Sequence, residues 1–164
     1  MSVLAVALTL AVAGTNEQGV LKAMTGKWKA IVSFSEGGGR FTVSLAEDTE
    51  VRQVDPNTIA FSLKPVTSAH PVFNNRLTYD APGKKYLLTV NTDSNPTIEK
   101  VALTYNGSDF SGRGSLKDAG GQTHVVDVKI TPTPDGVYEW SFLDPTLPAK
   151  NNIVFGFTFF KRLK

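Results

Sequence analysis

Residues 21–34, L-K-A-M-T-G-K-W-K-A-I-V-S-F, contain the change of pattern that decides the fold. Gly26 interrupts a short helical pattern, and from Lys27 onward apolar residues occur at nearly every second position. Side chains of a β-strand alternate between its two faces, so a period of two predicts a half-buried strand. Its apolar face would consist of Trp28, Ala30, Val32 and Phe34. The chain therefore enters its first strand from a closed end, through a turn at Gly26.

The segment before this turn, residues 17–24, has a helical pattern. Val20, Leu21 and Met24 stand at positions i, i+1 and i+4, which gives one or two helical turns a small apolar face. Gly26 follows, and glycine is a poor helix former. We therefore expect a short N-terminal helical turn before the first strand.

Residues 1–13, M-S-V-L-A-V-A-L-T-L-A-V-A, form an uncharged, mostly apolar segment. It is shorter than the roughly 20 residues of a membrane-spanning helix. Its length fits the apolar region of a secretory signal peptide, and Ala11-Val12-Ala13 fits the cleavage pattern. No basic residues precede the apolar run, so an N-terminal strand is the alternative. We expect an exported protein, periplasmic or secreted, if residues 1–13 are a signal peptide or its remnant, and a cytoplasmic protein otherwise.

Short β-rich segments follow the first strand at regular spacing. Turn sequences such as Asn106-Gly107 and Pro134-Asp135-Gly136 separate them. Because no long helical pattern follows, we predict an all-β fold, an antiparallel up-and-down meander over residues 18–164. Exposed edges promote aggregation, so the meander should close into a β-barrel of about 8–10 strands. The expected strands after the first are residues 41–45, 50–54, 58–63, 76–80, 85–91, 98–106, 108–116, 123–131, 137–143 and 153–162.

Two connectors, residues 64–72 and 144–152, are longer, and each contains two prolines. We expect them to be ordered loops at the rim of an opening, because binding residues are often found on such loops. The chain shows no internal repeat and no linker, so one barrel domain is predicted.

Composition excludes several classes of protein and site. The net charge is only +2, and the basic residues are scattered, which argues against a nucleic-acid-binding surface. The basic residues 161–164 are expected to be a solvated chain end. The absence of cysteine excludes disulfides, a cysteine nucleophile and cysteine-ligated metals.

Residues for catalysis or metal binding do not form a recognisable pattern. The two histidines, His70 and His124, are 54 positions apart, and no nucleophile motif accompanies either. We expect surface or partly satisfied histidines, no metal and no cofactor; haem binding by one histidine is the alternative. The carboxylates Glu47, Asp48 and Glu50 are expected to form a solvated turn.

Aromatic residues accumulate near the C-terminal end, where five of the ten phenylalanines follow residue 141. Alternation places three aromatic residues on one face of the strand at residues 137–143 and three phenylalanines on one face of the next strand. These rings either fill the core or line a cavity, which a barrel of about eight or more strands can contain. They are Tyr138, Trp140 and Phe142, and Phe155, Phe157 and Phe159.

The Gly26-x-Trp28 entry, the meander and Arg162 near the end of the last strand together resemble the lipocalin and fatty-acid-binding protein (calycin) superfamily. The chain is most similar to uncharacterised bacterial lipocalin-like barrels, through the Tyr-Asp-x-x-x-x-x-Tyr run at residues 79–86. The resemblance implies structural roles for Gly26, Trp28 and Arg162, with the Arg162 guanidinium stacking on the Trp28 indole at the closed end. The chain departs from lipocalins because it lacks a recognisable Thr-Asp-Tyr box and has no cysteine.

These observations predict a non-enzymatic barrel that binds a small apolar or amphipathic molecule in its interior, at the end opposite Trp28. The alternatives are a filled barrel that acts as a structural or interaction module, and a barrel enzyme such as an isomerase or hydrolase. We expect no nucleic-acid partner and no membrane span, and the sequence does not define the oligomeric state. The expected ligand contacts are Tyr138, Trp140 and Phe142, with Arg40, Tyr105 and Arg113 as polar partners.

Overall fold

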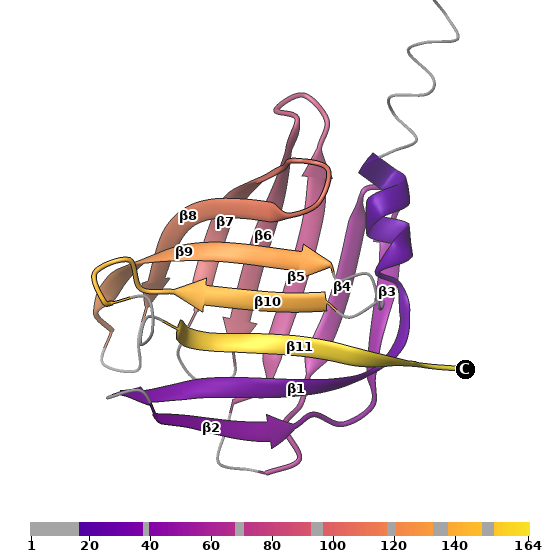
Figure 1. Cartoon of the computed structure of the whole chain (residues 1–164). Coiled ribbons are helices and arrows are strands. Elements are labelled where there is room, and N and C mark those ends of the chain that lie inside the picture. Colours follow the sequence, from indigo (N-terminus) through magenta and orange to yellow (C-terminus); the bar gives the residue numbers. More distant parts are fainter. Residues whose placement is uncertain are drawn as a thin grey trace, which may run out of the picture.

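The structure is a computed structural model. A short helix precedes a sheet whose strands curve round into a barrel, with the helix at one end (Figure 1). The helix spans residues 17–23, as the sequence predicts. The structure describes residues 17–37, 40–67, 71–92, 97–117, 121–132, 138–148 and 153–164, and for residues 35–37, 40, 41, 132, 153, 161 and 162 it describes the backbone only.

Strands make up almost all of the described chain after the helix. The predicted strands are found with small shifts at their ends, and the largest shift is at β5, which begins three residues before the predicted start at residue 76. The strands are β1 (Gly26–Gly37), β2 (Arg40–Leu45), β3 (Thr49–Asp55), β4 (Thr58–Leu63), β5 (Phe73–Asp80), β6 (Lys85–Thr92), β7 (Ile98–Tyr105), β8 (Phe110–Lys117), β9 (Thr123–Pro132), β10 (Tyr138–Leu143) and β11 (Ile153–Leu163).

The sheet is closed by the first and last strands. Each strand from β3 to β11 is antiparallel to the next, and β11 pairs with β1 from Lys27–Leu163 to Phe34–Phe155. The other edge of β1 pairs with two strands in turn. Residues 26–28 pair with β3, and β2 pairs with the part of β1 from Ile31 to Gly37. The eleven strands therefore occupy ten positions around the barrel. The predicted all-β meander, closed at about 8–10 strands with a short N-terminal helix, is confirmed.

The interior of the barrel is filled with apolar side chains from alternating positions. Of the predicted inner face of β1, Trp28, Ala30 and Val32 are buried, and Phe34 is partly buried. Three aromatic residues of β10 pair across the ladder with three phenylalanines of β11. The Phe142 and Phe155 rings stack with centroids 4.1 Å apart. The C-terminal aromatic residues therefore pack against one another inside the barrel.

Gly26 and Trp28 lie where the helix joins β1, and their role as the closed end of the barrel stays a prediction. Gly26 has a φ of 129°, a conformation that residues with a side chain rarely adopt. Trp28 is buried, and its Nε1 donates a hydrogen bond to the carbonyl oxygen of Met24 at 3.1 Å, which ties the end of the helix to β1. Tyr138 packs perpendicular to the Trp28 ring at a centroid distance of 5.6 Å. Arg162 pairs with Trp28 in the backbone ladder, but its side chain lies outside the described atoms, so the stacking stays a prediction.

The opposite end of the barrel is only partly described. The loops that connect strands there include residues 38–39, 68–70, 93–96, 118–120 and 149–152, which lie outside the described residues. The predicted rim loops, residues 64–72 and 144–152, both extend into these gaps. In the described part, Pro65 forms an isolated bridge with Ala46.

The N-terminal segment, residues 1–13, also lies outside the described residues, so the signal peptide stays a prediction. Within the described part of the chain, no helix has the length and apolar character needed to cross a membrane.

Replacing Trp28 with alanine should lower the free energy of unfolding by about 3–5 kcal/mol, because a large buried ring leaves a cavity. The change also removes the hydrogen bond to Met24 that holds the helix. Chemical denaturation measures the loss. Trp28→Phe, which keeps most of the ring volume and loses only the hydrogen bond, should lose less. A Trp28→Ala variant that melts within about 2 °C of the parent would contradict this role.

Candidate functional site

The barrel wall has an opening between β3 and β4. The two strands pair near their shared turn, and the adjoining chain segments meet again at the bridge between Ala46 and Pro65. The structure describes the backbone between these two points on both sides. There, residues 48–51 form no β-sheet pair with residues 61–63. The two backbones therefore separate in the middle of the wall.

The opening lies where the pairing of this chain segment is irregular. Residues 49–51 pair with the start of β1, and the pairs with β4 begin at Arg52. From the pair Ile31–Leu45 to the pair Trp28–Thr49, β1 advances by three residues and the neighbouring segment by four. Such an extra residue is a β-bulge, which bends the strand and interrupts the ladder locally.

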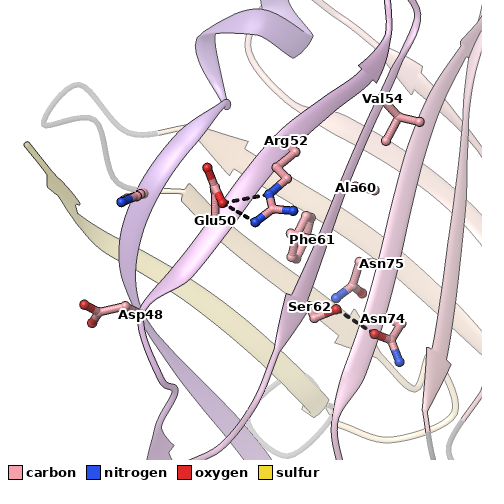
Figure 2. A pocket seen from close by; sticks show the side chains of 10 residues that line it. Asp48, Glu50, Arg52, Val54, Ala60, Phe61, Ser62, Asn74 and Asn75 are labelled. Atoms are coloured by element: carbon pink, nitrogen blue, oxygen red, sulfur yellow. Dashed lines mark hydrogen bonds and ion pairs between the residues drawn. The ribbon is translucent and has the colours of Figure 1, made fainter.

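A depression of about 700 Å³ lies at this opening (Figure 2). Its charged residues balance, since Lys27 and Arg52 are basic and Asp48 and Glu50 are acidic. The Nε of Arg52 donates a hydrogen bond to Glu50 Oε2 at 2.7 Å. Asp48 also forms an ion pair with Lys29, so three of the four charged lining side chains are paired within the described part of the chain, and Lys27 is the fourth. The remaining lining residues are Val54, Ala60, Phe61, Ser62, Asn74 and Asn75.

Phe61 and Asn75 reach the depression from the inner face of the wall. They are paired across β4 and β5, and both are buried. Their sequence neighbours Ser62 and Asn74 are exposed, and Ser62 Oγ donates a hydrogen bond to Asn74 Oδ1 at 2.6 Å (Figure 2). Because the backbones of β3 and β4 separate here, a molecule in the depression can contact inner side chains as well as outer ones.

Asn75 has an unpaired hydrogen-bond acceptor at this position. The residue is 3% exposed, and its Nδ2 donates a long hydrogen bond of 3.4 Å to the carbonyl oxygen of Phe73. Its Oδ1 accepts no hydrogen bond from any part of the chain that the structure describes. A buried acceptor without a donor costs about 1–3 kcal/mol of stability. This oxygen has almost no exposed surface in the free protein, so an N–H or O–H group of a bound molecule would satisfy it only after a small movement of the side chains around it.

The structure brings together three of the predicted ligand contacts, Tyr138, Trp140 and Phe142, on the inner face of β10. Phe142 is fully buried against Phe155, so it belongs to the packed core. Tyr105 lies in a separate group at the β7–β8 turn, where its hydroxyl donates a hydrogen bond to the Gly107 carbonyl oxygen at 2.8 Å. Contact of these residues with a ligand stays a prediction.

Of the two predicted arginine partners, the structure describes the side chain of Arg113 only, and it does not lie beside the aromatic residues of β10. Arg113 is 64% exposed, on the outer face of β8, and its Nε and Nη2 bind the two carboxylate oxygens of Asp127 at 2.6 and 2.9 Å. An outward-facing, paired guanidinium is not positioned to contact a molecule inside the barrel. Arg40 begins β2, and its side chain lies outside the described atoms.

The predicted absence of a catalytic cluster can be examined only in part, because His70 lies outside the described residues. His124 is half-buried at the start of β9. Its charge contributes to lowering the pKa of Asp144, but the larger causes are hydrogen bonds from the Thr146 hydroxyl and backbone N–H, at 2.6 and 2.8 Å. Asp144 therefore caps its own turn. Over the described ranges, no three histidine or carboxylate side chains are grouped so that they could hold a metal.

Phe61 and Asn75 were not predicted as site residues. The predicted strand starts at residue 76 and so leaves out Asn75, whereas β5 begins at Phe73. The alternation of Phe73, Asn75 and Leu77 places a polar residue at an inward position, and this signal would have identified Asn75. The opening itself depends on missing pairs between β3 and β4, which the local sequence does not reveal.

No protein-family model matches the sequence, and no curated protein matches it. The function is therefore inferred from the geometry of the site.

Asn75→Leu should raise the free energy of unfolding by about 1 kcal/mol, because it replaces a buried, unsatisfied polar group with an apolar one of similar size. Urea denaturation measures the difference. Asn75→Asp, which places a carboxyl group at the same buried position, should instead destabilise the protein. Destabilisation by both substitutions would show that the Asn75 amide is satisfied in the free protein.

The ion pair of Arg113 and Asp127 predicts a pH dependence. The hydrogen bond from Arg113 holds the pKa of the Asp127 carboxyl below its ordinary value of 3.8. A carboxyl group whose pKa is lower in the folded state stabilises the fold above its unfolded pKa, and this stabilisation disappears as the pH falls through the folded pKa. NMR titration should show a low pKa for Asp127 that rises in Arg113→Gln. An unchanged pKa in that variant would contradict the assignment.

Proposed function

We propose that the chain is a non-enzymatic, lipocalin-like protein that binds a small molecule in the opening between β3 and β4. The observation that supports this most strongly is the unpaired Oδ1 of Asn75 beside a depression of about 700 Å³. A buried polar group that the fold leaves unsatisfied is a common feature of functional sites. The closed barrel, with Trp28 and the helix at one end, agrees with the resemblance to the lipocalin and fatty-acid-binding protein superfamily.

The chemistry of the lining suggests the class of ligand. Two basic and two acidic side chains border the depression, so a net charge on the ligand gains little. Phe61 and Val54 offer apolar contacts, and Asn75 Oδ1 needs a hydrogen-bond donor. The ligand is therefore a neutral, partly apolar molecule with an N–H or O–H group. This moves the expected site from the open end of the barrel to its wall.

N-phenyl-1-naphthylamine is a suitable probe, because it is neutral and aromatic and has a single N–H donor. Its fluorescence should increase on binding to the full chain, and the titration gives a Kd. Asn75→Leu should raise that Kd by about tenfold, since a hydrogen bond contributes about 1 kcal/mol or slightly more.

Asn91→Leu is the matched control, because it makes the same change at an exposed position of β6 that does not line the depression. This variant should bind the probe as the parent does. Equal binding by the parent and Asn75→Leu, or no binding by the parent, would contradict the proposal.

The second candidate is the filled barrel that acts as an interaction module. Three apolar side chains, Val43, Leu45 and Val66, are each more than half exposed. The Val66 N–H donates a hydrogen bond to the Leu45 carbonyl oxygen at 2.8 Å, so these residues are neighbours on the surface. Exposed apolar clusters are typical of protein contact sites. Failure of the probe to bind, together with concentration-dependent association that Leu45→Lys abolishes, would favour this function.

A further inference from the structure

A second, smaller space lies on the inner side of Phe61. It holds only about 10 Å³, roughly the volume accessible to the centre of one water molecule. A buried water needs two to four polar partners, and most of the side chains around this space are aromatic or aliphatic. The lining residues are Met24, Trp28, Val51, Phe61, Tyr138, Trp140 and Phe159.

Two indole groups border this space, and they differ in one respect. The Nε1 of Trp28 donates to the Met24 carbonyl oxygen at 3.1 Å. The Nε1 of Trp140 has no acceptor in the portion of the chain that the structure describes, although Trp140 is only 1% exposed. A buried N–H group without an acceptor lowers stability, so natural proteins seldom retain one without a reason. Trp140 therefore offers a free donor inside the barrel.

Phe61 separates this inner space from the depression in the wall, because its side chain lines both. Its ring is perpendicular to the Trp140 ring, with centroids 5.2 Å apart. Such a contact provides at most a weak N–H···π interaction with the Trp140 indole, weaker than a hydrogen bond to oxygen. Phe61 also lies in the part of β4 that does not pair with β3. Rotation of this one side chain would connect the two spaces.

We propose that Trp140 Nε1 is the inner hydrogen-bond donor of the ligand site and that Phe61 moves aside to admit the ligand. This rests on the function proposed above and makes the ligand class more specific. The molecule has a carbonyl-type acceptor at its inner end, for Trp140, and an N–H or O–H donor at its outer end, for Asn75. Its apolar middle takes the place of the Phe61 ring.

Acetophenone and α-methylstyrene test this proposal, because they have nearly the same shape and only the ketone has an acceptor. Both are added to the ¹⁵N-labelled full chain, and the two indole N–H peaks are followed by NMR. Trp140→Phe removes one peak and so assigns it. Acetophenone should shift the Trp140 peak downfield and leave the Trp28 peak nearly unchanged, and α-methylstyrene should cause no downfield shift.

Phe61→Leu provides a second readout. The smaller side chain leaves more room beside Trp140, so the Kd for acetophenone should fall severalfold. If Phe61→Leu does not fold, Phe61→Met makes a milder change with the same expected direction.

Absence of a downfield shift of the Trp140 peak with acetophenone, or equal shifts with both probes, would overturn the role of Trp140. An unchanged or higher Kd in the folded Phe61 variant would overturn the role of Phe61. Neither result affects the binding of N-phenyl-1-naphthylamine through Asn75. The two proposals can therefore fail separately.

Discussion

Strand β1 pairs with three other strands, and the shape of the barrel depends on how it does so. One edge of β1 pairs with β11 and closes the barrel, and the other edge pairs with β2 and then with β3. A strand inside a sheet pairs along both of its edges, and β3 lies between β1 and β4. Its first residues, 49–51, pair with β1 only, and the pairs with β4 begin at Arg52. The missing pairs between β3 and β4 leave the opening in the wall, which Phe61 and Asn75 line.

Three buried polar atoms have no hydrogen-bond partner in the described part of the chain: Glu17 Oε2 on the helix, Asn75 Oδ1 and Trp140 Nε1. Asn75 and Trp140 line the two spaces that share Phe61. One is an acceptor and the other a donor, so a single molecule with both kinds of group would satisfy both. Elsewhere in the described interior apolar side chains pack closely, as the stacked Phe142 and Phe155 rings do. A binding protein that leaves such groups unsatisfied loses some stability in its free form and recovers it with the ligand. This combination distinguishes the proposed site from the filled remainder of the barrel.

The alternation of apolar residues and the turn residues in the sequence were sufficient to predict the fold. The alternation from Lys27 onward predicted β1 and its inner face, and Gly26 predicted the turn that its positive φ confirms. The aromatic residues of β10 and β11 were correctly assigned to one face each. The site was not predictable in the same way, because it depends on a bulge and on long-range pairing. Arg113 was expected beside a ligand, yet the alternation along β8 places it on the face opposite the buried Phe110 and Leu116, where it pairs with Asp127.

A crystal structure of the full chain soaked with phenol would test the central claim most directly, since phenol is a neutral ring with one hydroxyl donor. The account predicts phenol in the opening between β3 and β4, with its ring against Phe61. Its hydroxyl should lie about 2.7 Å from Asn75 Oδ1. An opening that stays empty while phenol binds elsewhere, or a phenol that makes no hydrogen bond to Asn75, would contradict the account.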